Sequence, residues 1–286
     1  MTNIIFTIFV DIPEDKIDNP GSYSADGKLQ QTNKSLIAKH NFLKYKDHLV
    51  QAQKEYANLV GCEYRVFVAD TAYYQFANVF ATHYPQISEY DIVNFYKHHL
   101  MVELSKSYNK ICYFDLDIIP NTTENIFEFF NFDTFIVPDS NDEAFWGKTV
   151  DQKYYNTCIR NPATKYWNAH AMLNEVGLDP DRNVYNTGIM IASNDTIKAL
   201  DYFGDFDKTL NLMTHVKTDS YSMYPKNIQR VFNYDNETVF SYKLALNNVD
   251  VTLLDKQWHF PIKDGHFETN AKFYHVIDKD FARFFK

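Results

Sequence analysis

Hydrophobic positions come first in a run and then at helical spacing along the amino-terminal part of the chain. Residues 4–10 form a continuous apolar run rich in β-branched and aromatic side chains, and residues 11–13 close it with Asp-Ile-Pro. Such a run, bounded by chain-breaking residues, predicts a buried first strand. A polar, turn-rich stretch covers residues 18–27, after which apolar side chains recur near helical spacing at Leu36, Phe42, Leu43 and Leu49. We expect a long first helix that ends near Leu59.

The same two patterns keep alternating as far as residue 114. Residues 64–69 are expected to form a second buried strand and residues 73–80 a short helix. Residues 91–107 predict the clearest helix, because Ser88 can cap it with Asp91 three residues further on. Its apolar stripe consists of Val93, Tyr96, Leu100 and Leu104. With residues 110–114 as the next buried strand, the alternation predicts an α/β fold with a mixed, mostly parallel sheet flanked by helices.

Composition and charge narrow the class of protein. Of the 286 residues, 45% are hydrophobic and 23% are charged, which is the composition of a globular protein. The formal net charge of −9 repels polyanions and argues against binding of nucleic acid. No apolar run approaches the roughly 20 residues of a membrane span, and the first residues lack the basic start of a secretory signal. These features predict a soluble, cytoplasmic protein.

Aromatic residues are unusually abundant, with 21 Tyr and 24 Phe among the 17% aromatic positions. Most are expected to build the core, although flat rings also suit stacking on sugars or nucleobases. Three cysteines, Cys62, Cys112 and Cys158, are widely spaced and odd in number, and predict neither a disulfide framework nor a Cys-based metal site. No repeat, low-complexity tract or flexible linker divides the chain, and we expect one domain.

The strand at residues 110–114 is followed by Asp115-Leu116-Asp117, and this is the strongest chemical signal in the sequence. Carboxylates beside an apolar core must be paired or must coordinate a metal. In an extended stretch, alternate residues project from one side, so both acids could reach one cation while Leu116 turns into the core. Mg²⁺ and Mn²⁺ are hard ions that suit oxygen ligands. Ile118, Ile119 and Pro120 are expected to end the strand.

Two other readings of the acidic motif stay open. The acids could simply face water at the end of a strand, as most acids do. The motif could also belong to a haloacid-dehalogenase-like phosphatase, in which an Asp-x-Asp motif also follows an apolar strand. That pattern continues with Thr or Val two residues on, where this chain has Ile119, and a shared sheet architecture does not fix the chemistry.

Five segments, in the same order along the chain, resemble the GT-A glycosyltransferases, especially those related to glycosyltransferase family 8. They are residues 96–121 with the Asp-x-Asp motif, 185–191 (Tyr-Asn-Thr-Gly-Ile-Met-Ile), 235–237 (Asp-Asn-Glu), 254–259 (Leu-Asp-Lys-Gln-Trp-His) and 273–279 (Phe-Tyr-His-Val-Ile-Asp-Lys). The resemblance spans about residues 4–280. It implies a single GT-A domain over residues 1–286, with a nucleotide-binding part at about 1–135 and an acceptor and metal-completing part at about 136–286. The chain departs from the family at Thr187, where Ser is usual, in lacking the terminal Lys-Pro-Trp, and over residues 139–180.

The resemblance also implies roles for individual residues. Asp115, Asp117 and His275 would hold Mn²⁺ or Mg²⁺, and this ion would bind the diphosphate of a nucleotide-sugar donor, with a UDP-sugar expected. The residues that would contact the donor are Thr7, Asp11, Lys97, Asp115, Leu116, Asn186, Gly188 and Lys279. Candidate bases or acceptor contacts are Asp139, Asp235 and Glu237, with Asp235 the first choice.

The sequence therefore predicts a metal-dependent glycosyltransferase that uses a nucleotide sugar and a glycan or other hydroxyl acceptor. The competing hypothesis is a non-catalytic carbohydrate-binding protein on the same fold, suggested by the many aromatic residues and the missing terminal motif. A sugar nucleotidyltransferase is disfavoured, because no Gly-rich phosphate loop follows the first strand and the chain contains only 8 glycines.

Overall fold

A six-stranded mixed sheet forms the centre of the protein in a computed structural model that describes residues 2–17, 22–23, 29–30, 34–138, 162–216, 235–262 and 268–285. In spatial order the strands are β4 (Glu63–Val68), β1 (Ile4–Phe9), β5 (Lys110–Phe114), β8 (Ile189–Ser193), β7 (Phe135–Pro138) and β9 (Val251–Leu254). The pairings of β1 with β4, β1 with β5 and β7 with β9 are parallel, whereas β8 runs antiparallel to both of its neighbours. The expected mixed, mostly parallel sheet is confirmed.

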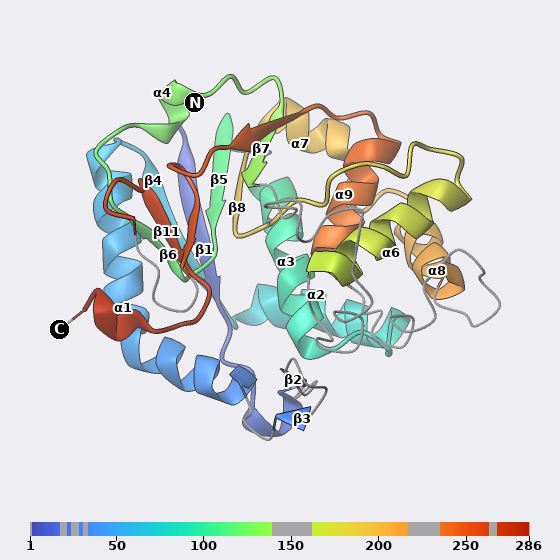
Figure 1. The fold of residues 1–286 in the computed structure, drawn as a ribbon, viewed down its shortest axis with the longest axis horizontal. Coiled ribbons are helices and arrows are strands. Elements are labelled where there is room, and N and C mark those ends of the chain that lie inside the picture. The colour runs from blue at the N-terminus through green and yellow to red at the C-terminus, as the bar shows by residue number, and fades with distance from the viewer. Residues whose placement is uncertain are drawn as a thin grey trace.

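Helices cover both faces of this sheet (Figure 1). The α-helices are α1 (Lys34–Leu59), α2 (Thr71–His83), α3 (Glu89–Leu104), α4 (Ile126–Phe129), α6 (Pro162–Glu175), α7 (Asn194–Leu200), α8 (Phe206–Val216) and α9 (Asn236–Leu246). Within the described ranges, η1 (Glu14–Lys16) and η3 (Phe281–Arg283) are short 3-10 helices. A three-stranded sheet contains β10 (Phe260–Ile262), β11 (Phe273–Val276) and β6 (Ile118–Pro120), and a small hairpin pairs β2 (Ser22–Tyr23) with β3 (Leu29–Gln30).

Alternate residues of the central strands enter two different cores. In β1, Ile4 and Phe6 pack in the core shared with α3, α8 and α9, whereas Ile5 packs on the opposite face with residues of α1 and α4. In β5, Tyr113 and Phe114 divide in the same way. Because side chains of a strand point alternately to its two faces, continuous apolar runs are the expected sequence of strands covered on both sides.

The predicted boundaries of the first strand and the two longer helices are close to those of the structure. The cap of α3 forms as expected: the Ser88 hydroxyl accepts from the Asp91 amide at 3.2 Å and donates to the Asp91 carboxylate at 2.7 Å. Of its predicted stripe, Tyr96, Leu100 and Leu104 are buried. In the part of the chain that the structure describes, no helix combines the length and apolar character needed to cross a bilayer.

Two expectations about strands were wrong. The strand β4 is not buried, because it forms an edge of the central sheet and leaves Glu63, Arg65 and Val68 exposed. Residues Ile118 to Pro120 were expected only to end the strand β5. They instead form a strand of their own, β6, which pairs antiparallel with β11. Three-residue strands of this kind depend on a partner far along the chain, which local pattern does not reveal.

The sheet topology gathers three segments at one edge. The parallel strands β1 and β5 both end there, and β8 begins there because it is antiparallel to β5, with Phe114 opposite Ile189. Ligands of open α/β sheets bind in the crevice beyond the carboxyl ends of the strands. The residues that follow β1 and β5 and precede β8 are therefore the first place to look for a site.

Candidate functional site

The acidic motif forms a tight turn between β5 and β6. The Ile118 amide donates to the Asp115 carbonyl at 3.0 Å, and the Asp115 amide donates to the Gly188 carbonyl at 2.7 Å. The expected extended conformation is therefore wrong, because the chain turns here as it passes from the central sheet into the small one. Leu116 is buried, as expected, and packs in the core of the small sheet.

A glutamine of α1 holds this turn in place. Gln53 is fully buried, and its side-chain Nε2 donates to the carbonyl oxygens of Asp115 and Ile118, each at 2.9 Å. The Tyr64 hydroxyl donates to Gln53 Oε1 at 3.1 Å, which fixes the orientation of the amide. Both hydrogens of the Gln53 amide are thereby used on the backbone of the acidic turn, so α1 determines where the two carboxylates lie.

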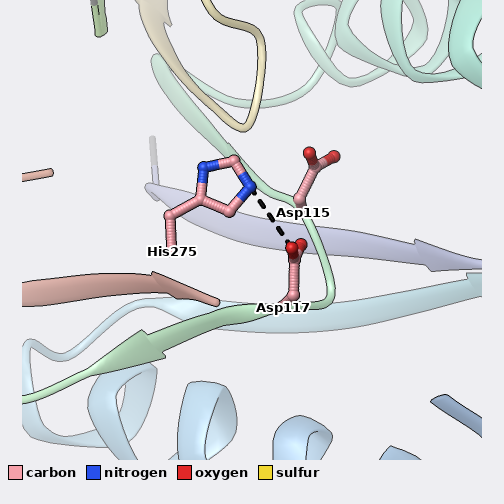
Figure 2. A group of neighbouring side chains, drawn as sticks. All are labelled: Asp115, Asp117 and His275. Carbon is pink, nitrogen blue, oxygen red and sulfur yellow. Dashed lines mark ion pairs between the residues drawn. The ribbon is translucent and has the colours of Figure 1, made fainter. Parts of the chain in front are cut away.

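Strand pairing brings a histidine to the same turn. In the small sheet, His275 of β11 lies opposite Ile118 of β6, and the Val276 amide donates to the Asp117 carbonyl at 3.0 Å. Figure 2 shows the imidazole of His275 turned toward the carboxylate of Asp117, with Asp115 on the same turn. His275 is therefore placed by the register of two short strands.

Asp117 is a buried carboxylate with two basic partners. Its side chain is 3% exposed, its Oδ2 lies 3.2 Å from His275 Nε2, and the same oxygen forms an ion pair with the Lys279 ammonium. Burial opposes ionisation of Asp117, but Lys279 and His275 outweigh it and hold the pKa of the carboxyl well below its usual value. Burial also lowers the pKa of Lys279, but the attraction of Asp117 outweighs burial and raises that pKa.

Lys279 adopts a left-handed backbone conformation, with a φ of 58°. For a residue other than glycine this conformation costs roughly 1–3 kcal/mol and tends to persist at functional positions. Its amide donates to the Val276 carbonyl at 3.0 Å, so Lys279 closes the turn that follows β11. This turn brings the ammonium back to the acidic motif.

Asp115 has a different set of partners on the side of α3. The Tyr113 hydroxyl donates to Asp115 Oδ1 at 2.6 Å, and Lys97 Nζ lies 3.8 Å from the same oxygen. Burial, followed by the charge of Asp115, raises the pKa of Tyr113 well above its usual value, so the phenol remains a donor. Lys97 is 2% exposed and donates to the Thr187 hydroxyl at 2.8 Å. Each of the two acids therefore has a lysine beside it. Asp115 has the buried Lys97, and Asp117 has Lys279, which is partly exposed.

The residues present fit a divalent cation. One ligand atom from each of Asp115, Asp117 and His275 lies within 4.8 Å of the other two, and the described residues contain no other such group of three. Ligand atoms around one Mg²⁺ lie about 2.1 Å from it, so the observed spread is close to that of a shared site. Two carboxylates with one imidazole form a mixed oxygen and nitrogen donor set, and carboxylates are the ligands preferred by Mg²⁺ and Mn²⁺.

The segment that precedes β8 lies against this cluster. A Cβ atom added to Gly188 would lie 2.7 Å from His275 Cε1 and 2.8 Å from Asn186 Oδ1, so only glycine fits here. Asn186 Oδ1 accepts from the Gly188 amide at 2.9 Å, and Asn186 Nδ2 donates to Glu237 at 3.2 Å. The predicted donor-binding residues Asn186 and Gly188 are therefore beside the predicted ligand His275.

The acidic residues predicted as bases lie behind this segment, at the start of α9. Glu237 is buried and accepts from the Thr187 amide at 3.1 Å. Asp235 caps α9 by accepting from the backbone amides of Glu237 and Thr238, at 2.8 and 3.1 Å. Both carboxylates thus have structural partners. Asp139 lies outside the described residues, and the three roles remain predictions.

A cavity of about 800 Å³ opens beside the acidic turn. Asp115, Leu116, Asp117 and Lys279 line one part of it, and the end of β1 with the residues after it, the first turns of α1 and the start of α3 line much of the rest. Asp11 lines the cavity and forms an ion pair with Lys39 at 2.6 Å. Thr7 is fully buried within β1 and Lys97 is buried within α3, so neither of these predicted contacts lines the cavity.

Some residues of the site were missed by the sequence analysis. Gln53 was detectable in principle, because it follows Leu49 by four residues and precedes Ala57 by four, which places a polar side chain on the buried stripe of the helix. Tyr113 and His259 offered no such signal, because their importance comes from contacts with Asp115 and His275, respectively.

No protein-family model and no curated protein matches the chain. Solved structures do match it. The chain is similar to a glycosyltransferase involved in the glycosylation of the major capsid of PBCV-1, with 11% identity over 97% of this chain and 94% of that chain and a TM-score of 0.45. It is also similar to the galactosyltransferase LgtC in complex with donor and acceptor sugar analogues, with 11% identity over 96% and 86% of the two chains and a TM-score of 0.45.

Mouse xyloside xylosyltransferase 1 in its apo form shares 13% identity over 74% of this chain and 75% of that chain, with a TM-score of 0.35. All three of these structures are glycosyltransferases.

Proposed function

We propose that the protein is a metal-dependent glycosyltransferase that moves a sugar from a nucleotide diphosphate sugar to a hydroxyl group of a glycan or another acceptor. One observation carries this proposal: Asp115, Asp117 and His275 gather beside Lys279 at the edge of a cavity of about 800 Å³. Two carboxylates and an imidazole within reach of one point form a donor set for a divalent cation, and a diphosphate in turn needs cationic partners. We expect a UDP-sugar as donor and Mn²⁺ or Mg²⁺ as the ion.

Asp115, Asp117 and His275 would hold the ion. When bound, it would act as a Lewis acid that stabilises the negative charge developing on the leaving nucleoside diphosphate. Lys279 would contribute a second positive charge at the wall of the cavity, because its ammonium already lies at the Asp117 carboxylate. Lys97 would act through Asp115, since it is buried and cannot reach the cavity.

The size and lining of the cavity support a nucleotide as its occupant. Ligand pockets of about 300–1,000 Å³ with mostly apolar walls and a few polar groups are typical of sites for small molecules. Phe9 and Tyr90 are among the apolar walls, while Asp11 and Lys39 supply charged groups away from the acidic turn. We assign the apolar part to the nucleoside and the end with Asp117 to the diphosphate.

The transferred sugar would lie near Asn186 and Gly188. This assignment comes from the resemblance of residues 185–191 to the family segment, and it is supported by the contact of Gly188 with the proposed ligand His275. Asp235, Glu237 and Asp139 remain the candidates for a catalytic base or for a contact with the sugar or acceptor. In this proposal residues 1–135 form the nucleotide-binding part and residues 136–286 the part that completes the metal site and receives the acceptor.

The proposal is tested by nucleotide-sugar hydrolysis. The purified protein is incubated with a panel of nucleotide sugars in Mn²⁺, in Mg²⁺ and in excess chelator, and release of the nucleoside diphosphate is measured. We expect release with at least one donor that depends on the ion. In Asp117→Asn the rate should fall by about 10³-fold or more, because a metal ligand is lost and metal catalysis supplies several kcal/mol.

The matched control is Asp47→Asn, which changes an aspartate whose side chain is 94% exposed and should leave the rate unchanged. Circular dichroism checks that both variants fold. If no donor is bound or hydrolysed with either ion, the enzyme assignment is refuted. Binding of glycans on an array without metal or nucleotide would then favour a non-catalytic carbohydrate-binding protein.

A further inference from the structure

A second histidine lies directly behind the proposed metal ligand. His259 precedes β10, and its Nε2 lies 2.8 Å from Nδ1 of His275. Both residues are buried, and the two ring centroids are 5.1 Å apart with an angle of 64° between the ring planes. The other ring nitrogen of His275, Nε2, faces Asp117 at 3.2 Å. His275 therefore has one nitrogen toward the acidic turn and one toward His259.

A hydrogen bond between two imidazole nitrogens requires one N–H and one lone pair. If His275 Nδ1 carries the hydrogen and donates it to His259 Nε2, the lone pair of His275 Nε2 faces the acidic turn and can bind a cation. If His259 Nε2 carries the hydrogen, a neutral His275 has its own hydrogen on Nε2, and that nitrogen can only donate to Asp117. The direction of this single hydrogen bond thus decides whether His275 can be a ligand.

We propose that His259 is a positioning residue for His275: it accepts the hydrogen of His275 Nδ1 and so presents the Nε2 lone pair to a divalent cation. The inference rests on the proposed metal-dependent function and adds a residue to it. Histidine ligands of metals usually donate their second N–H to a carboxylate, a carbonyl or a water, which fixes the tautomer and the ring orientation. In this protein the imidazole of His259 would accept that N–H of His275.

The backbone around His259 is built to hold the ring there. The His259 amide donates to the Asp255 carbonyl at 3.0 Å, and Asp255 Oδ1 accepts from the Trp258 amide at 3.0 Å. Two residues further on, Pro261 of β10 lies opposite His275 of β11 in the parallel pair. A turn on one side and a strand pair on the other therefore fix His259 relative to His275, so the contact is not that of a mobile surface side chain.

The test compares variants that differ in the acceptor and keep most of the bulk. His259→Phe retains a ring but has no acceptor, whereas His259→Gln places an amide near the position of Nε2 and can accept from His275. His83→Phe is the control, because it changes an exposed histidine of α2 in the same way. Binding of Mn²⁺ to each protein is measured by isothermal titration calorimetry without nucleotide, and folding is checked by circular dichroism.

We expect His259→Phe to weaken Mn²⁺ binding by about 10–100-fold, the usual effect of losing the partner of a ligating histidine. His259→Gln should restore most of the affinity, and His83→Phe should bind like the wild type. Equal affinity in His259→Phe and wild type, or equally weak binding in the Phe and Gln variants, would overturn the inference while leaving the proposed function intact. Absence of Mn²⁺ and Mg²⁺ binding by the wild type would overturn both.

A second readout does not depend on the variants. Long-range ¹⁵N–¹H spectra of the wild type saturated with diamagnetic Mg²⁺ report which nitrogen of His275 carries the hydrogen. We expect the hydrogen on Nδ1. A His275 that keeps its hydrogen on Nε2 under these conditions would overturn the inference even if His259→Phe fails to fold.

Discussion

Replacement of Gln53 by leucine should disrupt the acidic turn without removing either carboxylate. Gln53 is fully buried, and its amide donates to the carbonyls of Asp115 and Ile118, each at 2.9 Å. Leucine has a similar volume, so the side chain of Gln53→Leu still fills the space. It has no donor, so the carbonyl oxygens of Asp115 and Ile118 lose the hydrogen bonds from residue 53. The substitution therefore isolates the hydrogen bonds from the packing.

The size of the effect follows from the two lost hydrogen bonds. A buried polar group left without its partner costs about 1–3 kcal/mol. The Asp115 carbonyl keeps the Ile118 amide as a donor, so we count the Ile118 carbonyl as the group left without this partner and expect the free energy of unfolding to fall by about 1–3 kcal/mol. Because the turn carries Asp115 and Asp117, Mn²⁺ affinity should also fall, although both carboxylates remain.

Urea denaturation followed by circular dichroism gives the free energy of unfolding, and calorimetry gives the Mn²⁺ affinity. Gln51→Leu is the matched control, since Gln51 is an exposed residue of the same helix whose side chain donates to Glu55 at 2.8 Å. The control should change stability by less than about 0.5 kcal/mol, as is usual for surface substitutions. Equal stability and equal metal affinity of Gln53→Leu and Gln51→Leu would refute the idea that Gln53 holds the turn.

Three further predictions follow from contacts of the site and of α3. Gly188→Ala should lower the free energy of unfolding by about 1–3 kcal/mol, the usual cost of overpacking, because the added methyl would lie 2.7 Å from His275 Cε1; unchanged urea denaturation and unchanged Mn²⁺ binding would contradict this. Lys279→Met should lower donor turnover by about 100-fold, the effect of losing one electrostatic contact to developing charge, and turnover equal to that of wild type would remove Lys279 from the site. Burial, followed by the charge of Lys97, holds the pKa of His98 well below its usual value. The unfolded chain binds a proton at His98 below pH 6.5 that the folded protein does not bind, so stability should decrease as the pH falls, by about 1.4 kcal/mol between pH 7.5 and 5.5 from this residue. Urea denaturation at both pH values should show this loss in the wild type and a smaller loss in His98→Phe, and an equal loss in the two proteins would contradict the assignment.

Local sequence pattern was sufficient to predict the elements whose signals lie in contiguous residues. The apolar run of β1, the stripe of α3 and its Ser88 cap are properties of contiguous residues, so periodicity and capping chemistry identify them. The position of β4 at the edge of the sheet was not predictable in this way. Whether a strand lies at the edge or in the centre depends on the order of the strands in the sheet, which local pattern does not contain. The strand β6 was missed because it needs β11, which lies much later in the chain.

The candidate site was predictable in part, and for a physical reason. Two acids directly after a buried strand indicate a site that needs a compensating charge, and this signal is present in residues 110–117 alone. The turn conformation was not predictable, since it is set by Gln53 and by the pairing with Val276. His275 was named from its resemblance to a family motif, whereas its contact with His259 emerges only from the packing of two short strands.

The ion pair between Asp117 and Lys279 joins residues that are 162 positions apart in the chain, and His275 lies in the same distant segment. A cation shared by Asp117 and His275 would consequently cross-link the two segments, which places metal binding and folding in one thermodynamic cycle. At a free concentration 100 times the dissociation constant, such a ligand adds about 2.7 kcal/mol to the free energy of unfolding. Any partial opening that separates β11 from β6 would also separate His275 from Asp117, so such an opening would release the ion even with the central sheet intact.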